Sequence, residues 1–170
     1  GQLSRPSQKL IDLTAPLHPI HFNARFCLSH AAIHTLTFGL PVTAQFDHIN
    51  GIFPAPAPFS PEDAQIKQKL DDQKLLDPYA SFDAYGMEND PSGLNIPEIL
   101  RFRTLWKCYD MKDFGLYRYN MFQEKGHWFP GNFPTEENLK KVEISRCPAD
   151  IPIIDLIRET HDGLYRPKAK

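Results

Sequence analysis

The sequence predicts an α+β fold: a single domain with a mostly antiparallel sheet, two or three helices, and long loops rich in proline and aromatic residues. Three observations lead to this prediction. Several short segments alternate apolar and polar residues with a period of two, as strands with one buried face do. A few other segments begin with helix-capping residues. The chain of 170 residues also contains 16 Pro and 12 Phe, and proline interrupts both helices and central strands.

The N-terminal half contributes the first expected strands. Residues 22–29 place Phe22, Ala24, Phe26 and Leu28 on one face of an extended chain, which predicts a strand. Residues 31–38 fit either a helix or a strand, and their β-branched residues favour the strand. Residues 42–52 are a further candidate strand, which ends near a dipeptide typical of hairpins, Asn50-Gly51.

The strongest helix signal lies near the middle of the chain. Ser60 is a favourable N-cap, Pro61 suits the first turn, and Glu62 and Asp63 complement the positive end of the helix dipole. The sequence therefore predicts a helix that runs to about Leu76. Its candidate packing positions are Ala64, Ile66, Leu70 and Leu76.

The C-terminal half is expected to contain a hairpin and two more helices. Residues 100–108 alternate and favour a strand, with 114–123 as its returning partner; a helix from Ile96 is the competing interpretation. A short helix follows Thr135, and a last helix covers 150–161. The remaining expected elements are a short strand over 142–146 and a helix end at Gly163.

Length and termini favour one domain. A chain of this size supports a single core, and the expected domain covers 13–165, between an N-terminal arm of residues 1–12 and a basic tail of residues 166–170. The three cysteines are widely spaced and form no CxxC pair, which favours free thiols in a soluble protein of a reducing compartment. No motif in the sequence identifies an activity.

Charge is distributed unevenly along the chain. Between residues 13 and 61 the only formal charges are Arg25 and Asp47, yet this segment holds five of the seven histidines. The stretch 26–46 has no Asp, Glu, Lys or Arg, but its histidines, hydroxyls and Pro41 interrupt the apolar run, so we do not expect it to span a membrane. The net charge of −2 makes nucleic acid an unexpected partner.

The scarcity of charge over residues 13–61 predicts that the protein is an interaction or assembly subunit of a larger complex. Interface cores are depleted of charged residues and enriched in aromatic ones. The run 53–59, FPAPAPF, is expected to be extended and to suit binding over a neighbouring surface. The partner would be another protein or a second copy of the chain. Candidate anchors are Phe53, Phe59, Trp128 and Phe129.

A small metal-dependent hydrolase is the alternative. His30, His34 and His48 would bind a divalent metal such as zinc if neighbouring strands brought them together. Asp47 and His48 would then be the catalytic residues, with Asp47 supplying a carboxylate or orienting an imidazole. The spacing of His30 and His34 lacks the glutamate of an HExxH motif, which would be the general base.

Overall fold

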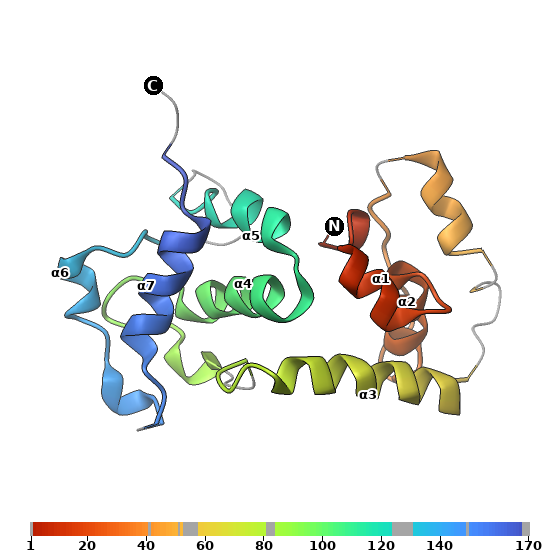
Figure 1. The fold of residues 1–170 in the computed structure, drawn as a ribbon, viewed down its shortest axis with the longest axis horizontal. Helices are drawn as coiled ribbons and strands as arrows, with labels where there is room; N and C mark the ends of the chain where they lie inside the picture. Colours follow the sequence, from red (N-terminus) through yellow and green to blue (C-terminus); the bar gives the residue numbers. More distant parts are fainter. Residues whose placement is uncertain are drawn as a thin grey trace. The chain divides into compact units, whose positions relative to one another are not determined.

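The computed structural model is all-helical in the residues it describes, which are 2–40, 42–50, 52, 58–80, 84–123, 131–148 and 150–167 (Figure 1). The predicted α+β fold with an antiparallel sheet is therefore wrong, because this described part of the chain contains no strand. In chain order the elements are η1 (Gln2–Ser4), α1 (Gln8–Thr14), α2 (Pro19–Leu28), η2 (Thr43–His48), α3 (Pro61–Leu75), η3 (Ala84–Met87), α4 (Ile96–Tyr109), α5 (Lys112–Tyr119), α6 (Glu136–Leu139), η4 (Ile144–Arg146) and α7 (Ile153–Leu164).

The chain divides into two compact units, Gly1–Gln73 and Lys74–Lys170. We call them the N-terminal unit and the C-terminal unit and describe each by itself. The expected single domain over 13–165 stays a prediction, because compact units fold either together or separately. No helix among the described residues has both the length and the apolar character that a membrane crossing requires.

The predicted strand over 22–29 is the helix α2. His18 is its N-cap, with Nδ1 accepting a hydrogen bond from the Ile20 amide at 3.3 Å, and Pro19 occupies the first turn. Both positions favour a helix start. Ile20 and Ala24 lie one turn apart and are buried together with Phe22, so the period-two pattern was the coincidence of a short window.

The other two expected strands of the N-terminal unit are also absent among its described residues. Residues 33–40 have no regular secondary structure, although the sequence favoured a strand over 31–38. The candidate strand over 42–52 contains η2 instead, a single run of 3-10 turns. Strands need partners for their backbone hydrogen bonds, and an all-helical unit offers none.

Helix α3 begins where the capping residues predicted. The Asp63 amide donates to Ser60 Oγ at 3.2 Å, and the Ser60 amide donates to Asp63 Oδ2 at 2.8 Å, which makes a reciprocal capping box. Of the expected packing positions, Ile66 is buried and Leu70 is half-buried, whereas Ala64 and Leu76 are exposed. The exposed face carries pairs four residues apart, which support an otherwise polar helix: Lys67 with Asp71, and Gln68 with Asp72.

In the C-terminal unit, the expected hairpin is the helix pair α4 and α5. The competing helical interpretation from Ile96 was therefore the correct one. The Asn95 side chain caps α4 by accepting from the Glu98 amide, and Asp110 ends the helix in the left-handed conformation with φ 54°. Helix α4 packs against both α5 and α7 (Figure 1), and its buried residues form the centre of the unit: Ile96, Ile99, Leu100, Phe102, Arg103, Leu105 and Cys108.

The last elements agree with the sequence in part. Thr135 caps α6 with a complete capping box, as expected, and α7 confirms a last helix. The short strand expected over 142–146 is wrong, because η4 lies there. Gly163 lies within α7 and not beyond its end. A Cβ at Gly163 would lie 2.2 Å from ring carbons of Trp106, so close helix packing requires this glycine.

A buried arginine connects three segments of the C-terminal unit. Arg103 Nη1 lies 2.6 Å from Asp77 Oδ2, and its Nε lies 2.6 Å from Glu159 Oε2. Lys107 also pairs with Glu159. Burial alone would lower the pKa of Arg103, but its bonds to the two carboxylates outweigh that effect and raise the pKa. The guanidinium stays charged and ties α4 to α7.

Candidate interaction surface

Residues 26–46, which we call the uncharged segment, lie mainly on the surface of the N-terminal unit. Residues 29–35 are all exposed. Three large apolar side chains of the segment are also open to solvent: Ile33 is 38% exposed, Val42 55% and Phe46 54%. Within its own chain much of the uncharged segment is not buried, so burial in the core of the unit does not explain its lack of charge.

The backbone of the uncharged segment leaves α2 and continues to η2. Ser29 is the C-cap of α2, and the Ile33 amide donates to the His30 carbonyl in a turn. From Ile33 to Leu40 the chain has no regular secondary structure, and Figure 1 shows it as the loop between α2 and the orange η2. Such a loop can adapt its backbone to another surface, because it gives up no helix when it moves.

The start of the uncharged segment is fixed by an ion pair between α2 and α3. Arg25 Nε lies 3.0 Å from Asp63 Oδ1, and Arg25 Nη2 also bonds Oδ2 of the same carboxylate. Burial would raise the pKa of Asp63, but its bonds from Arg25 and from the Ser60 amide outweigh it, and the pKa is lowered. Arg25, one of the two charges in 13–61, is thus used inside the unit.

The structure does not bring the proposed metal ligands together. His30 is exposed and its Nδ1 lies 2.8 Å from the Phe26 carbonyl oxygen, to which it donates; His34 is exposed as well. Among the described residues, no three His, Cys, Asp or Glu side chains are grouped so that they could hold a metal ion. The hydrolase alternative therefore has no geometric support.

The proposed catalytic pair, Asp47 and His48, has structural contacts. Asp47 Oδ1 accepts from Asn50 Nδ2 at 3.3 Å. The ring of His48 stacks on that of His18, with 3.6 Å between centroids and an angle of 4°. Parallel rings at this separation cannot both direct a nitrogen lone pair at one metal ion, since the lone pairs lie in the ring planes. The position of His18 directly before Pro19 is the sequence signal for its role as the N-cap of α2.

One of the four predicted partner anchors can be located. Phe59 is half-buried against the rings of Phe22 and Phe26, at centroid distances of 6.5 Å and 5.9 Å. It therefore packs within its own unit. Its role as a partner anchor stays a prediction, and the other three anchors lie outside the described residues: Phe53, Trp128 and Phe129.

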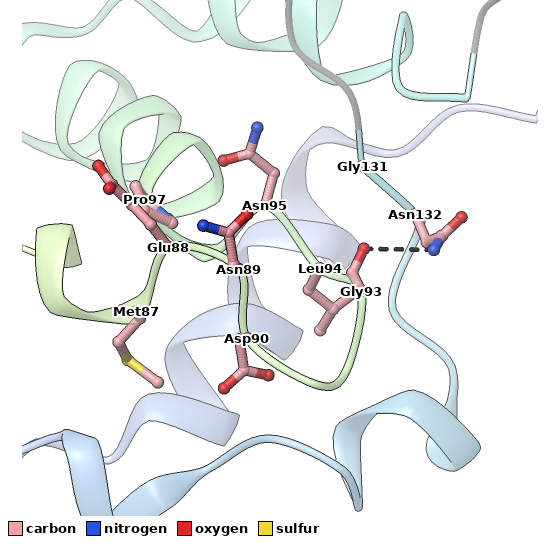
Figure 2. A pocket seen from close by; sticks show the side chains of 10 residues that line it. All are labelled: Met87, Glu88, Asn89, Asp90, Gly93, Leu94, Asn95, Pro97, Gly131 and Asn132. Atoms are coloured by element: carbon pink, nitrogen blue, oxygen red, sulfur yellow. Dashed lines mark hydrogen bonds between the residues drawn. The ribbon is translucent and has the colours of Figure 1, made fainter.

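The C-terminal unit contains a pocket of about 510 Å³ between the loop 87–97 and Gly131–Asn132 (Figure 2). Two of its lining side chains, the buried Asp90 and the exposed Asn132, form hydrogen bonds within the unit. Asp90 accepts from the Ser92 and Glu143 amides at 2.9 Å and 3.0 Å, and Asn132 donates to the Gly93 carbonyl at 3.2 Å. Burial would raise the pKa of Asp90, but hydrogen bonds from the Ser92 side chain and from the Glu143 and Ser92 amides outweigh it, and the pKa is lowered. Asp90 is thus an ionised acceptor that shapes the loop.

Comparisons with known proteins give no relative from which a role could be transferred: no family model, curated protein or solved structure matches the chain.

Proposed function

We propose that the protein is an interaction subunit that binds another protein through the uncharged segment. The observation that carries this proposal is the exposure of Ile33, Val42 and Phe46 in a stretch without ionised side chains. Isolated apolar residues on a surface are ordinary. Here three of them occur within fourteen residues of one another, and no charged side chain in the stretch opposes their desolvation.

The side chains of the uncharged segment indicate what kind of partner surface would match it. Its polar groups are hydroxyls, amides and imidazoles, which form hydrogen bonds without the desolvation cost of an ion. A matching surface is therefore apolar and neutral, with hydrogen-bond donors and acceptors at its rim. Burying one large apolar side chain contributes up to about 1.5–3 kcal/mol, so two or three such anchors provide much of the affinity of a specific contact.

The test places a photo-crosslinking amino acid at position 33, 42 or 46 in the protein expressed in its own cells. Matched controls carry it at Tyr117 or Ile144, which are also exposed, at 62% and 57%. We expect one protein to be captured from all three segment positions and from neither control. Crosslinks between copies of this chain would identify the partner as a second copy. Equal capture at segment and control positions would contradict the proposal.

A binding measurement with the captured protein, purified, completes the test. Replacing Ile33, Val42 and Phe46 together by Ser should weaken binding at least about tenfold, which is about 1.4 kcal/mol. The control replaces Leu75 and Leu76 by Ser, since these side chains are exposed at the end of α3 and after it, outside the segment. An unchanged affinity of the triple variant would exclude the uncharged segment as the binding surface.

A further inference from the structure

The contacts between η2 and the rest of the unit include a stack of two histidine rings. None of its six residues, all of which the structure describes, is buried. Its described contacts to the rest of the unit are polar or aromatic. Gln45 Nε2 donates to the Ser4 carbonyl at 2.7 Å, and the His48 ring stacks on His18.

Protonation would oppose the His18 contacts in three ways. A charged His18 has a proton on Nδ1, so it can no longer accept the hydrogen bond of the Ile20 amide that caps α2. Its positive charge would lie at the positive end of the α2 dipole. If His48 is charged as well, two cations face each other with their ring centroids 3.6 Å apart. Each effect favours the neutral ring.

The surroundings of the rings agree with this. Burial, and then the neighbouring His48, lower the pKa of His18. For His21, burial and Arg25 lower the pKa and outweigh Asp63 and the His48 backbone, which raise it. The remaining charged side chains on or next to the described elements around α2 are Arg5, Lys9, Asp12 and Asp47, together with those of α3: Glu62, Lys67, Lys69, Asp71, Asp72 and Lys74.

We propose that the stacked pair His18 and His48 is an acid-sensitive latch, which holds η2 against α2 near neutral pH and releases it on acidification. Because the folded-state pKa of His18 lies below its ordinary value of 6.5, the latch is fully closed above that pH and opens as the pH falls below it. Phe46 lies in η2. The latch would regulate partner binding by the uncharged segment only if the proposed function is correct. The acid-sensitive release of η2 does not depend on that function.

Amide hydrogen exchange of the purified chain, without any partner, tests the latch. Protection of residues 43–50 is measured at about pH 7.5 and about pH 5.5 as the ratio of intrinsic to observed exchange rates, with α4 as internal reference. We expect the protection to fall about tenfold or more between these conditions, while α4 stays protected. Residues 43–50 without protection at the higher pH, or equally protected at both, would overturn the latch.

Three variants separate the stack from general acid unfolding. His48→Phe retains a ring on His18, cannot become charged, and favours a cationic His18 through its π-face, so protection should persist at the lower pH. His18→Asn retains a good N-cap but removes the stack, so η2 should be unprotected at both values while α2 stays protected. His34→Phe is the matched control and should respond as the wild type does. Loss of protection by acid in His48→Phe to the wild-type extent would overturn the proposal.

Discussion

Each unit joins its segments through an arginine ion pair, but Arg103 is buried whereas Arg25 is half-buried, and their surroundings differ. In the C-terminal unit, Arg103 lies within a core that also buries Phe102, Tyr119 and Phe122. In the N-terminal unit, the buried hydrophobic residues among those described are fewer: Leu10, Ile20, Phe22, Ala24, Ile52 and Ile66. The ion pair of Arg25 with Asp63 is therefore a larger share of what holds the N-terminal unit together, and the uncharged segment of that unit remains mainly exposed. We infer that the C-terminal unit supplies stability and the N-terminal unit supplies the surface for binding.

The largest effect is expected from Arg103→Ala. Its loss leaves the carboxylate of Asp77 in a mostly buried setting without its partner, whereas the more exposed Glu159 keeps Lys107. Breaking a buried pair costs about 3–5 kcal/mol. Urea denaturation followed by tryptophan fluorescence measures it, since both tryptophans belong to the C-terminal unit. Arg101→Ala, which breaks an ion pair with Glu98 at the surface, should cost less than about 1 kcal/mol. Equal losses in the two variants would contradict the buried role of Arg103.

A smaller effect, about 2–3 kcal/mol, is expected from Asp63→Asn, which leaves Arg25 uncompensated and weakens the capping box. The pKa of Asp63 is lower in the folded state than in the unfolded chain. Its ionised form therefore stabilises the fold above about pH 4, and this contribution is lost as the pH falls through the folded-state pKa. Urea denaturation at about pH 7 and about pH 3, followed by circular dichroism, measures both effects.

The matched control for that variant is Asp71→Asn, whose carboxylate pairs with Lys67 on the exposed face of α3. It should change stability by less than about 1 kcal/mol. If Asp63→Asn lost as much stability at the acidic pH as at neutral pH, its carboxylate would not be the group responsible for the acid dependence.

The smallest effect is expected from replacing Ile33 and Phe46 together by Ser. Both side chains are exposed, so their loss should change the free energy of unfolding by less than about 0.5 kcal/mol. Phe22→Ser, at a buried position of the same unit, should cost several times more. The measurement is the same urea denaturation followed by circular dichroism. A double variant as unstable as Phe22→Ser would place these side chains in the core and remove the contrast between the units.

Local capping chemistry could be predicted from the sequence. Ser60, Thr135 and their neighbours identified the starts of α3 and α6, because a cap depends on residues within one turn. The same chemistry is present at Asn95, which caps α4, but the alternation of residues 100–108 favours a strand in the sequence. Leu105 broke that alternation, and it is buried in α4. One residue inconsistent with a period of two was the signal for a helix.

The composition of the uncharged segment could be predicted from the sequence, but the exposure of its side chains could not. The absence of charge from 26–46 is visible in the sequence, yet whether Phe46 is buried or exposed depends on contacts with distant residues. The stacking of His48 on His18 joins positions 30 residues apart, and the ion pair of Arg25 joins it to Asp63, 38 residues on. No periodic pattern within one segment contains such information.

The ion pair between Arg25 and Asp63 joins the two ends of the chain segment that lies between these residues, and so closes a loop. The entropy cost of closing such a loop depends only weakly on its length, because each doubling of the length of a flexible loop adds only about 0.6 kcal/mol. Insertions or deletions between these two residues should therefore leave the ion pair nearly as strong as before. The uncharged segment could therefore change in length during evolution while the helices at its base stay as they are. On the proposed function, this would let the segment be refitted to a changed partner.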